Sequence, residues 1–153
     1  PLITIVLLLI KRRGFTDRLS IEALTYLHTV RIPVELLLYW LFLSKQVPQL
    51  MTFEGRNFDI IAGITAPFIG YLCFTKEKMN KKIALIWNLV SIGLLLNIVI
   101  NALLSIPSPF QKFAFDQPNI GLAYFPFIWL PAFIVPAVLF SHIVCIIKLR
   151  KEK

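Results

Sequence analysis

The sequence predicts an all-α fold, a polytopic bundle of transmembrane helices with five visible spans, the first of them truncated. Of the 153 residues, 58% are hydrophobic, and the mean hydropathy is +0.77. A soluble domain is usually about 45–50% apolar. The charged residues cluster between long apolar runs, which is the pattern of helices that cross a bilayer. We expect one transmembrane domain with spans at about 1–10, 20–44, 57–74, 83–105 and 124–147.

The first predicted span, residues 1–10, is about half as long as a bilayer requires. It ends at Lys11-Arg12-Arg13-Gly14, a basic segment that anchors a helix end at the membrane surface. The chain begins with Pro1 and inside an apolar run. We therefore expect an N-terminally truncated fragment of a longer protein.

The second span begins after a capping residue, Thr16 or Ser20, and continues to about Ser44. Pro33 should kink this helix without ending it, because helices in membranes tolerate proline when neighbours replace the lost hydrogen bond. It leaves the carbonyl of Thr29 without its usual amide partner, and we expect that carbonyl to be a further polar group inside the bundle.

The later spans differ in regularity. The third, 57–74, contains Pro67, whereas the fourth, 83–105, is the most regular by length and composition. Three prolines exclude regular structure from the loop 106–123, and its phenylalanines suit a segment in the headgroup region. Three more prolines interrupt the fifth span, 124–147.

The loops differ in their content of lysine and arginine. Residues 11–18, 75–82 and 148–153 each carry four basic residues, whereas 45–57 carries two and 106–123 carries one. Because an excess of basic residues marks the cytoplasmic side, we expect a cytoplasmic C-terminus and two proline-rich loops outside. The formal net charge of +8 lies mainly at helix ends. The expected partner is therefore the lipid bilayer and not nucleic acid.

Ionisable residues interrupt the second span. His28, Arg31 and Glu35, with Tyr39, fall within about 80° of one another on a helix. Arg31 is about 16 Å along the helix from Ser20, near the middle of a bilayer. Charged groups at that depth are costly and by default indicate a functional site or a buried polar joint. We expect Arg31 and Glu35 to pair within the helix.

The fourth span offers the complement to this stripe. Asn97 and Asn101 are one turn apart, at a depth close to that of Glu35. Amides of this kind hydrogen-bond between helices in lipid. We expect Glu35 or Arg31 to contact one of them, whereas Asn88 is predicted to point elsewhere and is assigned no role. The candidate buried polar site therefore consists of His28, Arg31, Glu35, Asn97 and Asn101.

A second cluster lies in the outer loops. Glu54, Arg56 and Asp59 occur within six residues at the start of the third span, and Asp116 of the other outer loop could join them. A carboxylate pair can perform acid–base chemistry or hold a divalent cation. The simpler interpretations are a helix start with an Arg–carboxylate clamp and, for Asp116, an Asx turn.

His28 and His142 lie at similar predicted depths on different helices, about 12 Å and 9 Å from the cytoplasmic surface. Two such histidines could ligate a haem or transfer protons, or each could hydrogen-bond a neighbour or a headgroup. Cys73 and Cys145 have no CxxC spacing and are interpreted as small buried hydrophobic residues. No metal site is predicted, and no cofactor apart from the haem alternative.

Four stretches resemble a group of small, uncharacterised bacterial multi-pass membrane proteins with no assigned function: RIPVELLLYWLFL, MTFEGRNFD, FAFDQPN and FPFIWLPAFIVP. The resemblance covers most of the chain. It implies a bacterial inner membrane and a longer protein with an additional N-terminal helix. It identifies no catalytic residue.

Three functions remain open at this point. The first is an integral inner-membrane protein whose buried site binds or passes a small polar solute or protons, with Arg31 and Glu35 as the binding groups. The second is a structural or accessory subunit, associated with other membrane proteins or with copies of itself, whose polar residues only set helix packing. The third, less favoured, is a membrane-embedded enzyme that uses the outer carboxylates.

Overall fold

The computed structural model describes residues 13–75 and 80–151, and within these ranges it is helical with no strands. The prediction of an all-α fold is confirmed. The α-helices are α2 (Arg13–Arg18), α3 (Ile21–Leu27), α4 (Arg31–Leu43), α5 (Asp59–Gly70), α6 (Lys81–Leu104) and α7 (Val135–Lys151). The shorter helical segments are η1 (His28–Val30), η2 (Gln49–Met51), η3 (Tyr71–Thr75), η4 (Gly121–Ala123) and η5 (Leu130–Ile134).

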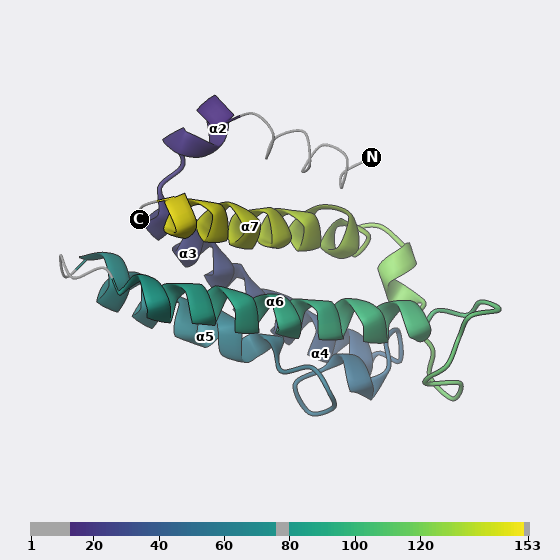
Figure 1. Cartoon of the computed structure of the whole chain (residues 1–153). Coiled ribbons are helices and arrows are strands. Elements are labelled where there is room, and N and C mark those ends of the chain that lie inside the picture. The colour runs from purple at the N-terminus through teal and green to yellow at the C-terminus, as the bar shows by residue number, and fades with distance from the viewer. Residues whose placement is uncertain (1–12, 76–79, 152–153) are drawn as a thin grey trace.

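The long helices form one bundle. Helix α7 packs against α3 and α6, and α5 packs against α3, α4 and α6 (Figure 1). Two loop regions, residues 44–58 and 105–129, meet at one end of this bundle, and we call them together the cap. The backbone amides of Ile120 and Gly121 both donate to the carbonyl of Gln46, which joins the two halves of the cap.

The second predicted span is divided. Residues 28–30 form a 3₁₀ turn between α3 and α4, so the change in geometry precedes Pro33. Proline removes an amide hydrogen and crowds the carbonyl four residues earlier, which favours a tighter turn there. The carbonyl of Thr29 accepts from the backbone amide of Arg31, which corrects the expectation that it lacks an amide partner.

Two helices are long and apolar enough to cross a membrane, Lys81–Leu104 and Leu130–Lys151, and Asp59–Phe74 is a shorter apolar helix. The fourth predicted span therefore matches α6 closely. The fifth begins at Leu130 and not at Tyr124, because residues 124–128 form a bend and a turn. Residues 1–10, the first predicted span, lie outside the described residues.

The interior is layered. One apolar cluster lies toward the cap and includes Leu38, Met51, Ile98 and Val138. A second, formed by Ile21, Leu24, Cys73, Ala84, Val144, Cys145 and Leu149, lies toward the other end. Along α6 and α7, and along the path from α3 to α4, the residues between these clusters include buried polar ones. The fold thus places a polar layer between two apolar cores.

Candidate functional site

The polar layer is sealed inside the bundle. His28, Arg31 and Glu35 are only 0%, 2% and 1% exposed. Helix α5 packs closely against α4 at Gly63. A Cβ atom added to this glycine would lie only 3.1 Å from the Cβ of Arg31, so the absence of a side chain allows the close approach. Asp59, one turn before Gly63, is thereby brought beside the arginine.

Arg31 bonds to three other helices. Its Nη1 donates to Asp59 Oδ1 of α5 at 2.7 Å and to the Ser91 carbonyl of α6 at 3.4 Å. Its Nη2 lies 2.7 Å from His142 Nε2 of α7. The predicted pairing with Glu35 is therefore replaced by a pairing with Asp59. A basic residue four positions before an acidic one is the weaker order for a pair within a helix, and the short bond to Asp59 is charge-assisted.

The position of Arg31 fixes the state of the His142 ring. A guanidinium can only donate, so His142 Nε2 must accept and the ring is neutral, with its proton on Nδ1. That proton is donated to Asn88 Oδ1 over 2.7 Å, and Asn88 Nδ2 donates to the Ala84 carbonyl at 2.8 Å. Asn88, assigned no role from the sequence, is therefore a full member of the site.

Glu35 belongs to the same network through Asn57. The Nδ2 of Asn57 donates to Glu35 Oε1 at 2.6 Å and to the Met51 carbonyl at 3.1 Å. Its Oδ1 accepts from the backbone amide of Asp59 at 3.0 Å. Bonds therefore run without a break from Ala84 through His142, Arg31, Asp59 and Asn57 to Glu35.

Some polar atoms of this layer remain unbonded. Among the residues that the structure describes, His28 Nδ1 and Nε2, Arg31 Nε and Glu35 Oε2 are buried without a hydrogen-bond partner. The His28 ring stacks on that of His142, with centroids 3.8 Å apart and planes at 16°, and it meets Trp87 edge-on at 5.4 Å. Buried polar groups are nearly always bonded, so each of these atoms needs an explanation.

The stacked histidines bear on the haem alternative. Two rings that ligate one iron direct a nitrogen at it from opposite sides, whereas these rings face one another. Both nitrogens of His142 are already bonded to protein groups. Haem ligation by this pair would require His142 to give up one of these contacts and the two stacked rings to separate, so nothing in this geometry favours it. No group of three or more metal-ligating side chains occurs within residues 13–75 and 80–151.

Asn97 and Asn101 lie elsewhere. The Nδ2 of Asn97 donates to the Arg56 carbonyl at 2.7 Å, and Asn101 Nδ2 donates to Asn97 Oδ1 at 3.2 Å. The two amides hold the first cap loop to α6 and have these partners in place of Arg31 and Glu35. Asn97 is about 9 Å farther along α6 than Ser91, which contacts Arg31, so its side chain reaches the first cap loop and not the arginine.

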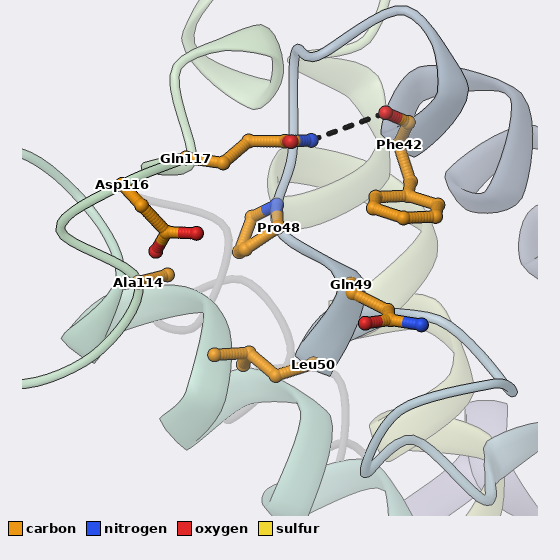
Figure 2. A pocket seen from close by; sticks show the side chains of 7 residues that line it. All are labelled: Phe42, Pro48, Gln49, Leu50, Ala114, Asp116 and Gln117. Atoms are coloured by element: carbon orange, nitrogen blue, oxygen red, sulfur yellow. Dashed lines mark hydrogen bonds between the residues drawn. The ribbon is translucent and has the colours of Figure 1, made fainter.

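The outer cluster is also dispersed. Asp59 is buried with Arg31, whereas Glu54 is exposed and interacts with the Tyr39 hydroxyl. The Arg56 guanidinium lies 5.8 Å from the centre of the Phe113 ring. Asp116 lines a cavity of about 280 Å³ in the cap (Figure 2). Glu54 and Asp59 therefore do not converge on one cleft.

Both cysteines are buried and free. Cys73 and Cys145 belong to the apolar cluster away from the cap, where Cys145 Sγ lies 3.9 Å from the Ile21 carbonyl. Their placement agrees with their interpretation as small hydrophobic residues.

The comparisons with known proteins give one match. Residues 2–150 match the family model described as domain of unknown function DUF8737. No curated protein and no solved structure matches the chain. The family model therefore covers nearly the whole chain, as the resemblance to uncharacterised proteins did, and it assigns no activity.

Proposed function

We propose that this chain, which belongs to the DUF8737 family of unknown function, is a multi-pass inner-membrane protein with a buried proton-binding site. Glu35 and His28 are the proposed proton-binding groups. Arg31, Asp59, Asn57, Asn88 and His142 position them. The bacterial inner membrane comes from the resemblance noted above, and the remaining steps rest on the arrangement of side chains.

The distribution of polarity supports a lipid environment. The layer around Arg31 is buried, whereas large apolar side chains face outward on α4, α5 and α6. Trp40 is 64% exposed, Phe68 63% and Ile86 61%. A soluble protein rarely exposes apolar surface so extensively around charged residues that are fully buried. In lipid this arrangement is the expected one.

The helical paths are long enough for three of the five proposed spans, and a fourth is shorter than the hydrocarbon core of a bilayer. Helix α6 and the helix Leu130–Lys151 satisfy the requirement by length and composition. The path from Ile21 to Leu43 is helical throughout and extends for about 34 Å at 1.5 Å per residue. The helix Asp59–Phe74 is shorter, at about 24 Å, and its Asp59 end begins inside the polar layer.

The basic ends of the helices support the proposed orientation. Helix α2, the start of α6 and the end of α7 lie at the end of the bundle opposite the second cap loop, residues 105–129 (Figure 1). There Lys148 Nζ donates to the carbonyls of Thr16, Asp17 and Leu19. Positive charge at this end and its scarcity in the cap favour a cytoplasmic C-terminus.

The observation that supports the proton-binding role is that some buried polar atoms of the layer are hydrogen-bonded and others are not. Both terminal nitrogens of Arg31 are bonded, but Glu35 Oε2 and both His28 nitrogens are not. A joint that served packing alone would be expected to satisfy its buried polar atoms. A carboxyl group and an imidazole with unbonded atoms are the usual carriers of protons in membrane proteins.

A proton is favoured over a larger solute. Every ionisable side chain of the layer is surrounded by protein, and the cavity shown in Figure 2 is lined by Phe42 of α4 and by cap residues, but by none of these ionisable side chains. A proton can occupy Glu35 or His28 without any cavity, whereas a solute would require one.

The test is proton flux into liposomes that contain the full chain and an internal pH-sensitive dye, driven by a potassium diffusion potential. We expect flux above that of protein-free liposomes, loss of flux in Glu35→Gln and retained flux in Glu54→Gln. Glu54→Gln is the matched control, because Glu54 is an exposed carboxylate outside the network. Absence of flux in the unsubstituted protein would overturn the proposal.

One observation favours a second candidate, a structural subunit in which the polar layer only fixes packing. Arg31 joins α4 to α5, α6 and α7 through short bonds, as a packing joint would. In that case a cysteine at position 35, with Cys73 and Cys145 removed, should be protected from thiol reagents on both sides of the membrane. Labelling from either side would show a water-filled path to position 35 and would exclude a sealed packing joint. The separation of Glu54 from Asp59 leaves no observation in favour of the enzyme alternative.

A further inference from the structure

Trp87 of α6 contacts both histidines of the polar layer. Its ring centre lies 5.4 Å from that of His28, with the planes at 68°, and 5.7 Å from that of His142, with the planes at 55°. The next residue, Asn88, accepts the Nδ1 proton of His142. Two adjacent residues of α6 therefore face the histidine pair, one through a hydrogen bond and the other through its ring.

The position of His28 depends on these rings. The residue is completely buried, and neither of its nitrogens has a hydrogen-bond partner among the residues that the structure describes. Its ring stacks on that of His142 and meets that of Trp87 edge-on. In place of hydrogen bonds, the two aromatic contacts therefore determine where the imidazole lies.

The Trp87 indole is itself tied to α5. Its Nε1 donates to Thr65 Oγ1 at 2.9 Å, and Thr65 Oγ1 donates its own proton to the Ile61 carbonyl at 2.7 Å. Trp87 is half-buried, whereas the preceding Ile86 is 61% exposed. The indole therefore extends from the lipid-facing surface inward to His28, and it cannot turn away without losing its bond to Thr65.

Of the two histidines, His28 is the one that can take up a proton. His142 Nε2 accepts from Arg31, and the Nδ1 proton is already donated to Asn88. A neutral His28 ring carries a proton on one nitrogen and leaves the other able to accept a second. The ring is then a cation, and the face of an indole attracts a cation within about 6 Å of its centre. The separation of 5.4 Å from Trp87 is within that range.

We propose that Trp87 is a positioning residue for proton uptake at His28, where it holds the imidazole and stabilises its protonated form. The inference rests on the proposed function, because it assigns a partner to one of the two proposed proton-binding groups. Within the described residues, Arg31 of α4 and His142 of α7 are the titratable groups that face His28. The Arg31 cation opposes a second positive charge, and its pairing with Asp59 of α5 offsets this in part. From α6 the imidazole meets only the uncharged indole.

The first test measures the fluorescence of Trp87 alone, in the full chain with Trp40→Phe and Trp129→Phe in detergent micelles. A protonated imidazole in contact with an indole quenches its emission much more than a neutral one does. We expect the emission to fall reversibly by about twofold as the pH is lowered from about 8 to about 3. The fall should be absent when His28→Gln is added, because the carboxylates of the layer are unchanged in that variant. A chain that retains only Trp40, which is 64% exposed, is the matched control and should show no such fall.

The second test uses the liposome assay for proton flux. Trp87→Leu should lower the flux about tenfold, because His28 loses both the contact that positions it and the indole face. Trp87→Phe keeps an aromatic ring but loses the bond to Thr65, so its flux should fall only about threefold. Trp40→Leu is the control for removal of a tryptophan and should leave the flux unchanged, because Trp40 lies on the exposed face of α4.

The two tests separate this inference from the proposed function. If Trp87 emission does not change with pH, or changes equally with His28→Gln, the inference is overturned even where the unsubstituted protein carries protons. Equal flux in Trp87→Leu and Trp40→Leu would also overturn it. Emission that titrates through His28 in a protein without flux would support the role of Trp87 and overturn proton transport alone.

Discussion

Arg31 of α4 donates to His142 of α7 across the centre of the bundle, with 2.7 Å between Nη2 and Nε2. This contact joins two helices 111 positions apart in the sequence and fixes the proton of the imidazole on Nδ1. It also holds the His142 ring in its stacked position on the His28 ring. A buried arginine, rather than an apolar core, therefore sets how the helices meet in this layer.

Substitution of Arg31 by methionine should strongly destabilise the fold. It leaves the Asp59 carboxylate, only 4% exposed, buried without its cation. Loss of one partner of a buried ion pair costs about 3–5 kcal/mol. The measurement is the free energy of unfolding in detergent micelles by denaturant titration. The double variant Arg31→Met with Asp59→Leu should recover much of this loss, since no buried charge of the pair remains. A loss below about 1 kcal/mol in the single variant would show that the pair is solvated and the layer open.

Substitution of Asn88 by leucine should destabilise the protein by a smaller amount. It removes the acceptor of the His142 Nδ1 proton and leaves that donor buried. An unsatisfied buried donor costs about 1–3 kcal/mol. The neighbouring exposed residue Leu89 provides the control, because Leu89→Ala should change the free energy of unfolding by about 0.5 kcal/mol or less. If the two substitutions have equal effects, Asn88 is not needed to hold His142.

The helical class of this chain and two of its long helices were predictable, but the partners of the site were not. Apolar runs of sufficient length defined α6 and the Leu130–Lys151 helix, and the spacing of His28, Arg31 and Glu35 placed them on one buried face. The pairing of Arg31 with Asp59 depends on the alignment of α5 against α4. The close approach of the two helices at Gly63 sets that alignment. The alignment of one helix against another cannot be read from the hydrophobic periodicity of the sequence.

The prediction that Asn88 points away from the site was wrong for a different reason than the Arg31 pairing. In α6 both the inner and the outer faces carry leucine and isoleucine, so hydrophobic periodicity does not show which face is buried. The available signal was the line of small and polar residues at Ala84, Asn88 and Ser91, at helical spacing. Small residues let helices approach, and they identify the inner face where apolar content does not.

The first cap loop should tolerate no side chain at Gly55. An added Cβ would overlap the Gln49 carbonyl oxygen and lie 2.6 Å from the Leu50 Cα, and both are backbone atoms that cannot rotate away. Gly55→Ala should therefore shift the loop that carries Asn57, weaken its bond to Glu35 and lower the thermal unfolding midpoint. Gly93 in α6 is the matched control, since nothing lies within 4 Å of its added Cβ. Alanine there should stabilise the helix by about 0.5–1 kcal/mol. Equal responses at the two glycines would mean that the cap loop is not closely packed.

The proposed orientation predicts opposite labelling at the two ends of the bundle. With Cys73 and Cys145 replaced by serine, a single cysteine at Phe115, which is 73% exposed in the cap, should react with an impermeant thiol reagent added to intact cells. A single cysteine at Arg150, exposed at the end of α7, should react only after the membrane is opened. The reason is the concentration of lysine and arginine at the α7 end, which favours its retention in the cytoplasm. The reverse pattern would invert the topology, and labelling of both positions in intact cells would exclude a membrane barrier between them.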